Sequence, residues 1–331
     1  MTATVPGTES AGGRREDAEA TTAPQPQPHT AEAEAAPDGG VVVALAQIAP
    51  HLGDVPRNLQ RHLAVIDEAR RGGAHLLIFP ELSLTGYFLK DLVPDVALRL
   101  DAPELRDLAA AADGVDVVVG GVLETEDVRF HNAAFYFSNR RLHHVHRKVY
   151  LPTYGLFDEQ RYFAQGDRFR TFDAPLPTAK QPRPWQAGLL ICEDMWHMSA
   201  PSLLARQGVD VLLCPSSSPG RGVTHGTALG TALSYDAMTR TFAQLTTSYV
   251  LYCNRVGYED GVHFWGGSRV VDPDGKVCVE GGDGEEMVWH RIDLDALRRV
   301  RLAYPMLRDE RHDLTDAETD RLRHLRMSEP A

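Results

Sequence analysis

From Val41 onward, runs of consecutive apolar residues alternate with segments whose apolar residues recur every three or four positions. An unbroken apolar run is typical of a strand buried on both faces, and the longer spacing is typical of a helix with one buried face. The run VVVALAQI predicts the first strand, and VPRNLQRHLAVIDEARRGG predicts a helix that ends at its glycines. Further strands are predicted in AHLLIFPE, VDVVVGGVL, NAAFYFS, RLHHVHRKVY, GLLIC, VDVLLCP, SYVLYCNRV, GGSRVVDP, GKVCVEG and EMVWHRIDL, and further helices in APELRDLAAAADG, SAPSLLARQG and ALGTALSYDAMTRTFAQLT.

The order of these elements indicates how they pack. Strands and helices alternate early in the chain, which favours parallel strands covered by helices. Polar connections such as Ser138-Asn139-Arg140 favour antiparallel hairpins. The sequence therefore predicts an α/β fold of two mixed sheets packed face to face with helices outside. No internal repeat or linker interrupts residues 41–314, which we expect to form one domain.

The two ends of the chain differ from this body. Residues 1–40 are rich in Ala, Glu, Thr and Pro and contain almost no large apolar side chains. Such a segment cannot bury enough surface to offset the entropy of ordering it, so we expect a disordered tail over 1–40. A charged segment begins at about Ala303, and we expect residues 315–331 to form a C-terminal tail.

Composition and charge narrow the function classes. The 331 residues carry a net charge of −12, which argues against nucleic acid or an anionic membrane as the main partner. No run is long and apolar enough to span a membrane, and the N-terminus lacks an export signal, so we expect a cytoplasmic protein. The four cysteines lie far apart without a CxxC pair, which indicates neither a zinc site nor a disulfide framework. We therefore expect no metal and no cofactor.

The stretch AGLLICEDMWH places a cysteine at the end of a buried strand, directly before two acidic residues. Glu193 and Asp194 cannot continue the strand into a dry core without partners, so Cys192 lies where the chain leaves the sheet. A single cysteine in an apolar run is most often a structural core thiol. A reactive role for Cys192 requires other groups from elsewhere in the chain.

Two other predicted strands also lead to a reactive polar group. In FPELSLTGY, Pro80 stops the hydrogen bonding of the strand, and Glu81 then faces whatever lies beyond the sheet edge. In HRKVYLP, Lys148 lies inside an otherwise strand-like stretch. A carboxylate in a partly dry pocket can accept the proton of a thiol, and an ammonium can stabilise a thiolate and an oxyanion. Glu81, Lys148 and Cys192 thus provide a base, an electrostatic stabiliser and a nucleophile, although their sequence positions do not show that they converge.

These three segments resemble the motifs of the nitrilase, or carbon–nitrogen hydrolase, superfamily. FPELSLTGY is similar to its glutamate motif, HRKVYLPTYGLFDEQRYF to its lysine motif and LLICEDMWH to its cysteine motif, in the order that the family has. The resemblance runs from about Val41 to Leu314. It implies a four-layer αββα sandwich of two mixed sheets, as the hydrophobic pattern independently predicts.

The resemblance also implies roles for four residues. Glu81 matches the general base, Lys148 the cation that stabilises the oxyanion, and Cys192 the nucleophile. Glu159, eleven residues beyond Lys148, matches the second glutamate of the family, which positions the lysine and the substrate.

Within the superfamily, the chain is most similar to the glutaminase domain of glutamine-dependent NAD synthetases. The segments that carry this likeness are LSLTGYFLKDL, KVYLPTYGLFDEQRYF, ICEDMWH and NRVGYEDGVHFWGGSRVVDPDGK. The likeness implies that Tyr87 and Tyr154 line the substrate pocket and that Glu193 holds the amide nitrogen of the substrate. The sequence contains no synthetase half and no Ser-Gly-Gly-x-Asp-Ser loop, so we expect no adenylation, and the loop Cys214–Gly222 differs from the glutamine-recognising loop of that branch.

Three functions are consistent with these residues. The leading hypothesis is a free-standing cysteine amidohydrolase that cleaves a small linear amide through a thioester. The first alternative is a glutaminase subunit that supplies ammonia to a separate synthetase partner. The second is an inactive member of the fold used for binding or assembly, which the intact Glu81, Lys148, Glu159 and Cys192 disfavour. Tyr304, Pro305, Met306 and Leu307 would be awkward in solvent, so we also expect a homodimer or larger homo-oligomer.

Several other features have simpler interpretations. We expect His143, His144 and His146 on a solvated strand face, because no Cys, Asp or Glu has the spacing of a metal site with them. We interpret Cys214 and Cys253 as core thiols and GGDGEE (281–286) as a hairpin turn. Trp265 is either pocket wall or packing. The last expectation is that Arg298, Arg299 and Arg301 belong to a solvated or interface helix.

Overall fold

The computed structural model describes residues 1–2, 40–177, 183–220 and 229–328. The predicted tail over 1–40 lies almost entirely outside the described residues, as does the end of the loop Cys214–Gly222. The chain divides into two units, Met1–Ala36 and Pro37–Ala331. All the helices and strands below belong to the second unit.

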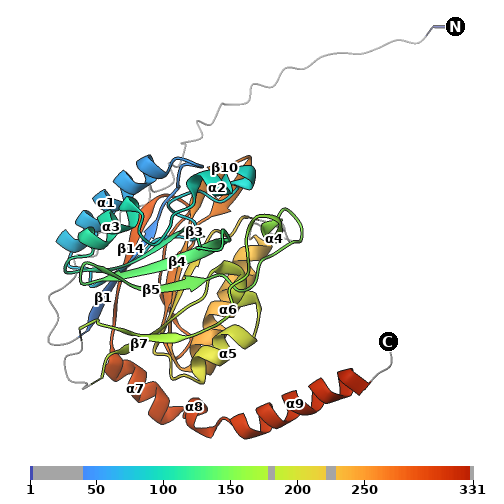
Figure 1. Ribbon diagram of the computed structural model, residues 1–331. Helices are drawn as coiled ribbons and strands as arrows, with labels where there is room; N and C mark the ends of the chain where they lie inside the picture. Colours follow the sequence, from blue (N-terminus) through green and yellow to red (C-terminus); the bar gives the residue numbers. More distant parts are fainter. Residues whose placement is uncertain (3–39, 178–182, 221–228, 329–331) are drawn as a thin grey trace. The chain divides into compact units, whose positions relative to one another are not determined.

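The first sheet is mixed, with parallel strands at its centre. β1 pairs in parallel with β2, and β2 with β3, whereas β14–β1, β3–β4 and β4–β5 are antiparallel. Its six strands are, in spatial order, β14 (Glu286–Ile292), β1 (Val41–Gln47), β2 (Leu76–Ile78), β3 (Asp116–Glu124), β4 (Phe130–Ser138) and β5 (Arg141–Arg147) (Figure 1).

The second sheet repeats this arrangement. In spatial order it contains β6 (Thr171–Ala174), β7 (Trp185–Leu189), β8 (Val211–Ser216), β9 (Tyr249–Asn254), β12 (Arg269–Val271) and β13 (Val277–Glu280). β7–β8 and β8–β9 are parallel, and the other pairs are antiparallel. Counted from β6 and from β14 respectively, the two sheets have the same succession of pairing directions. The sequence shows no repeat, so this likeness is one of topology.

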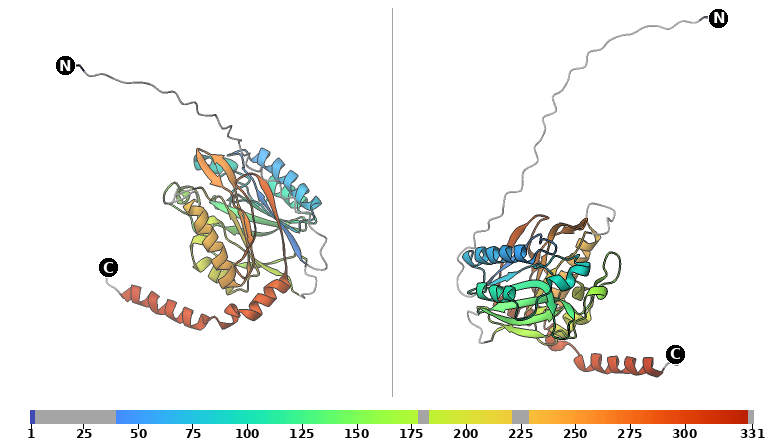
Figure 2. Two further views of the ribbon diagram at one scale, coloured as in Figure 1. Left: turned by 180° about the vertical axis from the view of Figure 1, so that it is seen from behind. Right: turned by 45° about the horizontal axis from the view of Figure 1, so that its top comes forward.

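Helices cover the outer faces of the two sheets. α1 (Val55–Arg71) and α3 (Pro103–Ala111) lie against the first sheet, and α5 (Ser199–Ala205) and α6 (Gly230–Thr246) lie against the second (Figure 2). α1 begins after Asp54, whose side chain accepts a hydrogen bond from the Arg57 amide at 3.1 Å, and ends at Gly72. Its buried face follows the helical spacing that the sequence predicts.

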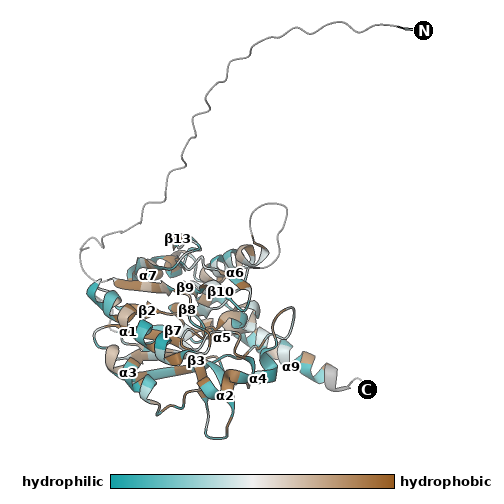
Figure 3. Ribbon diagram, turned by 90° about the horizontal axis from the view of Figure 1, so that it is seen from above, coloured by the Kyte–Doolittle hydropathy of each residue, from teal (hydrophilic) through white to brown (hydrophobic). Residues whose placement is uncertain are grey.

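The inner faces of the two sheets form the main core. β1 of one sheet faces β9 of the other, and the largest buried cluster contains Val43 and Leu45 together with Leu189 and Leu251. Figure 3 shows apolar residues along the strands and mixed polarity on the helices. The predicted α/β fold, two mixed sheets between helical layers, is confirmed. Cys214 and Cys253 are fully buried in this core, as predicted.

One predicted hairpin forms and another does not. β4 and β5 pair through a turn in which Asn139 and Arg140 have positive φ. The interpretation of GGDGEE as a hairpin turn is wrong, because β13 before it and β14 after it belong to different sheets. The segment instead passes from one sheet to the other, and the buried Gln47 side chain donates to the carbonyls of Gly282 (2.9 Å) and Gly284 (2.7 Å).

A separate hairpin was not predicted. β10 (Val256–Glu259) and β11 (Val262–Trp265) pair around Asp260-Gly261, where both residues have positive φ. An Asp-Gly pair is a strong sequence signal for such a turn, and it would have identified this hairpin. Trp265, at its end, is 7% exposed and stacks on Tyr252 with ring centroids 6.1 Å apart, so its role is packing.

The C-terminal segment is helical. α7 (Leu294–Ala303), α8 (Met306–Asp309) and α9 (His312–Ser328) follow β14, so the predicted tail continues as a helix to Ser328. Arg298 and Arg299 of α7 are exposed as predicted. Arg301 is only partly exposed, and it donates to Asp210 Oδ1 (2.8 Å) and to the Val209 carbonyl (2.6 Å). Within the described ranges, no helix is both long enough and apolar enough to cross a membrane.

Candidate active site

The three segments singled out by the sequence end close together at one edge of the sandwich. Glu81 follows β2, Lys148 directly follows β5, and Cys192 begins a 3-10 turn, η2 (Cys192–Trp196), three residues after β7. Lys148 was expected inside a strand, but it lies one residue beyond the strand end. Its amide still donates to the Asn132 carbonyl (2.8 Å) before the chain leaves the sheet. This position lets the side chain reach groups outside the sheet.

Glu81 is held on every side by hydrogen-bond donors. Its Oε1 accepts from Lys148 Nζ (2.7 Å) and from Asn132 Nδ2 (2.7 Å). Its Oε2 accepts from the Ser217 amide (2.8 Å), and the Ser217 hydroxyl donates to the Glu81 carbonyl (2.8 Å). The residue is 1% exposed. The carboxylate is thus fixed in one orientation before any substrate arrives.

Lys148 is shared between two carboxylates. Its Nζ lies 2.7 Å from Glu81 Oε1 and 2.7 Å from Glu159 Oε1, and the Tyr87 hydroxyl donates to the same Glu159 oxygen (2.5 Å). Burial would lower the pKa of Lys148, but Glu159 and Glu81 outweigh it and raise that pKa well above its usual value. Burial raises the pKa of Glu159 to about 7, against the lowering effect of Lys148. One ammonium between two buried carboxylates leaves an excess negative charge, which explains why one carboxyl retains a proton more readily.

Cys192 occupies a strained backbone position beside this cluster. Its φ is 45°, in the left-handed region that is unfavourable for a residue with a Cβ, and only 7% of the residue is exposed. Burial and the charge of Glu81 raise the pKa of the thiol well above its usual value, while Lys148 and a hydrogen bond with Tyr235 oppose this rise. The thiol is therefore neutral at rest and needs a base at the moment of reaction.

Asp194 links the cysteine turn to the lysine segment, and its role was not predicted. Its Oδ1 accepts from the amides of Val149 and Tyr150 (3.0 Å each). Its Oδ2 is bonded to the Ile191 amide (2.9 Å) and lies 3.0 Å from His146 Nε2. The side chain is fully buried. The acidic pair after Cys192 signalled a need for partners, but not which strand would supply them.

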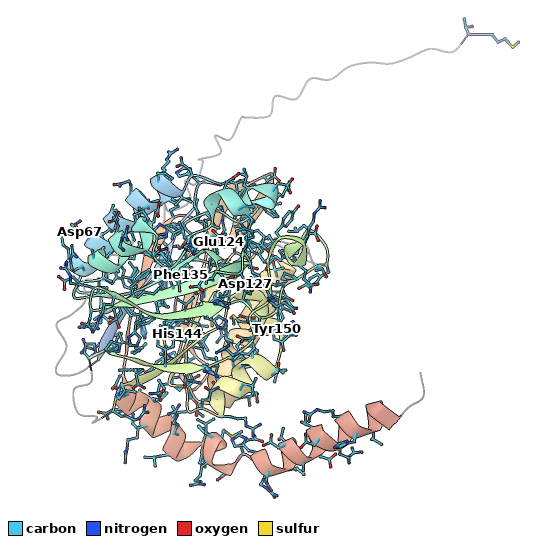
Figure 4. The ribbon with its side chains drawn as sticks, viewed as in Figure 1. Asp67, Glu124, Asp127, Phe135, His144 and Tyr150 are labelled. Carbon is cyan, nitrogen blue, oxygen red and sulfur yellow. The ribbon has the colours of Figure 1, made fainter. Side chains whose placement is uncertain are left out.

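The prediction that His143, His144 and His146 lie on a solvated strand face is wrong for His146. His143 is exposed, but His144 is half-buried against Phe172 (ring centroids 4.2 Å apart), and His146 is buried beside Asp194. Figure 4 labels His144 on β5 and Tyr150 beyond the end of that strand. Among the described residues, no group of three or more His, Cys, Asp or Glu side chains could hold a metal ion.

Cys192 opens into a cavity that also contains the predicted substrate-binding residues. Tyr87, Tyr154 and Glu193 line this cavity together with Cys192. The Tyr154 hydroxyl donates to Glu193, with distances of 2.9 and 3.1 Å to its two carboxylate oxygens. Burial raises the pKa of Glu193, and the bond from Tyr154 opposes that rise. Three further aromatic residues of the wall were not predicted: Phe157, Trp196 and Tyr235.

We expect Lys148→Met to impair both catalysis and folding. Without the ammonium, Glu81 and Glu159 face each other unpaired, so the free energy of unfolding should fall by about 3–5 kcal/mol. Turnover should fall on the order of 10²–10³-fold in kcat, the scale for loss of one oxyanion donor. Steady-state kinetics and urea denaturation measure the two effects. Lys90→Met, which removes an exposed ion pair with Asp260, is the control and should change neither. A loss confined to KM would instead assign Lys148 to substrate binding.

Comparison with known proteins identifies a family and several relatives of this chain. Residues 42–302 match the model of the family described as Carbon-nitrogen hydrolase. A glutamine-dependent NAD(+) synthetase of Thermotoga maritima is 35% identical over 275 residues, which cover 80% of this chain and 44% of the synthetase. The chain thus spans less than half the length of the synthetases that it matches.

Two further relatives are similar over nearly their whole length. An (R)-stereoselective amidase of a Pseudomonas species is 33% identical over 282 residues, or 84% of this chain and 94% of the amidase. The crystal structure of a carbon-nitrogen hydrolase from Helicobacter pylori G27 superposes with a TM-score of 0.71 at 23% identity, covering 85% of this chain and 98% of that one. The second likeness is evidence for the fold alone.

Proposed function

The chain belongs to the carbon–nitrogen hydrolase family, and from this membership we propose that it is a cysteine amidohydrolase acting on a small linear amide. Cys192 is the nucleophile, Glu81 the general base and Lys148 the group that stabilises the oxyanion. The observation that carries the proposal is the buried Glu81–Lys148–Glu159 cluster, in which the charges of Glu81 and Lys148 act on Cys192 at the wall of a cavity.

Acylation begins with transfer of the thiol proton of Cys192 to Glu81. The sulfur attacks the amide carbonyl carbon, and the carbonyl electron pair moves to the oxygen, which Lys148 stabilises. Glu81 then gives its proton to the amide nitrogen, the C–N bond breaks, and ammonia or an amine leaves. The product of this half-reaction is a thioester at Cys192.

Deacylation uses the same base. Glu81 takes a proton from a water molecule, whose oxygen attacks the thioester carbon. The C–S bond breaks, the electron pair returns to sulfur, and Cys192 regains a proton as the carboxylic acid leaves. During acylation, Glu193, which is bonded to Tyr154 at the cavity wall, accepts a hydrogen bond from the amide nitrogen of the substrate.

A substrate panel tests the proposed function. Ammonia release is measured with glutamine, asparagine, N-carbamoyl amino acids and aliphatic amides, with Cys192→Ala as the blank. We expect release from at least one amide by the wild type and none above background by the variant. No release from any member of the panel would count against an amidohydrolase.

The likeness to glutamine-dependent NAD(+) synthetases supports one alternative, a glutaminase subunit that passes ammonia to a separate synthetase. This alternative predicts turnover of glutamine that rises when an ammonia-dependent NAD synthetase is added. An amidase acting alone predicts turnover that the added protein leaves unchanged. A protein used only for binding or assembly would form no thioester with any substrate.

We further propose that the chain forms a homodimer or larger homo-oligomer. Large apolar side chains are exposed on α5 and in the C-terminal segment: Leu203 (42%), Leu302 (66%), Tyr304 (57%) and Met306 (46%). Water contact with such a set is unfavourable, and a second copy would cover it. Light scattering at micromolar concentration should give at least twice the monomer mass, and a monomer mass would refute the proposal. Tyr304→Asp combined with Met306→Asp should shift the mass toward the monomer if these side chains lie in the interface.

A further inference from the structure

Tyr235 of α6 contacts the sulfur of the nucleophile. Its hydroxyl lies 3.2 Å from Cys192 Sγ, and the residue is 1% exposed. The side chain also forms part of the cavity wall. Neither the sequence motifs nor the mechanism above uses this residue.

The hydrogen bonds around Tyr235 favour one direction. The Trp196 indole Nε1 donates to the phenol oxygen at 3.2 Å, so this oxygen already acts as an acceptor and its own hydrogen is free to point elsewhere. With a neutral thiol, either Cys192 or Tyr235 can be the donor. A thiolate has no hydrogen to give, so ionisation of Cys192 makes Tyr235 the donor. Trp196, Tyr235 and the sulfur then form a short donor chain that ends at the negative charge.

The thiolate needs such a donor because the nearby ammonium is already shared. Lys148 lies 2.7 Å from carboxylate oxygens of both Glu81 and Glu159, so the two carboxylates already outweigh its charge. The titratable and charged groups that act on Cys192 come from separate segments of the fold: Glu81 after β2, Tyr87 after Glu81, Lys148 after β5, Tyr235 on α6 and Tyr252 on β9. Of the three tyrosines, Tyr235 is the one that is hydrogen-bonded to the sulfur in the described part of the chain.

We propose that Tyr235 is a further catalytic residue, whose hydroxyl donates a hydrogen bond to the Cys192 thiolate while Trp196 holds the phenol oxygen. The inference rests on the proposed function in that Cys192 is the nucleophile. Burial and the nearby Cys192 raise the pKa of Tyr235 well above its usual value, so the phenol retains the proton that it must donate. The same bond assists deacylation, when the C–S bond breaks and its electron pair returns to the sulfur.

The pH dependence of Cys192 alkylation by iodoacetamide tests this inference without any amide turnover. In this reaction the thiolate displaces iodide: an S–C bond forms, the C–I bond breaks, and the thiol proton has already passed to Glu81 or water. Tyr235→Phe keeps the ring and removes only the hydroxyl. We expect the midpoint of the rate profile to rise by about one pH unit and the rate at neutral pH to fall about tenfold, as for loss of one hydrogen bond to a charged group. Peptide mass spectrometry separates Cys192 from the partly exposed Cys278.

Tyr252→Phe is the matched control. Tyr252 is buried against Tyr235, with ring centroids 4.8 Å apart, but among the described residues the tyrosine hydroxyl hydrogen-bonded to the Cys192 sulfur is that of Tyr235, not that of Tyr252. Its alkylation profile should coincide with that of the wild type. An unshifted profile for Tyr235→Phe, or equal shifts for both variants, would overturn the inference, because the hydroxyl of Tyr235 would then have no specific effect on the thiolate.

A second variant guards against a folding defect in Tyr235→Phe. Trp196 is 41% exposed, so Trp196→Phe should fold, and it removes the donor to the phenol oxygen. We expect its midpoint to shift in the same direction by a smaller amount; no shift would contradict the donor chain. The proposed amidohydrolase function and the role of Tyr235 can fail independently. If the protein hydrolyses no amide but the midpoint shifts, the hydrogen bond from Tyr235 to the thiolate stands. If the protein is an active amidase and the midpoint does not shift, that hydrogen bond is refuted.

Discussion

Cys192→Ala should reduce amide hydrolysis on the order of 10⁴–10⁶-fold, the scale for removing the nucleophile of a group that acts as a unit. Cys214 and Cys253 cannot replace it because they are fully buried, and the partly exposed Cys278 does not line the cavity. The fold should survive, since the substitution removes one sulfur atom at a position that is 7% exposed. Ammonia release measures the loss, and circular dichroism with thermal unfolding measures the fold.

Cys214→Ala is the matched control for this experiment. It removes a buried thiol of the second sheet that lies outside the cavity, so it should change stability but leave kcat nearly unchanged. An adduct of the acyl group at Cys192, trapped from substrate and found by mass spectrometry, would support the thioester. If Cys192→Ala keeps more than a few per cent of the wild-type turnover, the nucleophile is another group.

Glu81→Gln should slow acylation by about 10²–10⁴-fold, the range for loss of a general base. The change is nearly isosteric, but it disturbs the hydrogen bonds that the carboxylate accepts. Both Glu81 oxygens accept hydrogen bonds, from Lys148, Asn132 and the Ser217 amide. The glutamine NH₂ must face one of these donors, so we expect the free energy of unfolding to fall by about 1–3 kcal/mol. Single-turnover kinetics measures acylation, and an unreactive amide analogue measures binding, which should change much less.

The pH profile of Glu81→Gln tests the electrostatic coupling of Glu159 to Glu81. The negative charge of Glu81 is one cause of the raised pKa of Glu159, which is about 7. Removing that charge lowers the pKa of Glu159. An acidic limb of kcat/KM that reports Glu159 should therefore move to lower pH. Near-wild-type acylation with an unshifted limb would show that another group activates Cys192.

Glu159→Gln is the comparison for Glu81→Gln. It makes the same change of charge at the other carboxylate beside Lys148. Because Glu159 contacts Lys148 and Tyr87, and no hydrogen bond joins it to Cys192 among the described residues, its loss should affect the position of the ammonium more than proton transfer. We therefore expect a smaller fall in acylation than for Glu81→Gln.

The chain's local patterns determined most elements and the candidate chemistry. Apolar runs and helical spacing predicted the strands from Val41 onward, the covering helices and the α/β class, because burial on one or both faces leaves a period in the sequence. The positions of Glu81 and Cys192 after buried strands were also visible, because Pro80 and the Glu193-Asp194 pair interrupt the apolar runs, whereas Lys148 was expected inside a strand.

Only the tertiary structure decided which of these segments meet. The strands on either side of GGDGEE lie in different sheets, although the segment resembles a hairpin turn, because β14 pairs with β1, far away in the sequence. For the same reason the sequence missed Asp194, whose four partners include an amide before Cys192 and groups at the end of β5. Tyr235 is 43 residues from Cys192 in the sequence. The helical spacing of α6 predicts only that Tyr235 is buried, not that it contacts the sulfur. Contacts of this kind depend on how sheets and helices pack across the core, and no local period in the sequence records them.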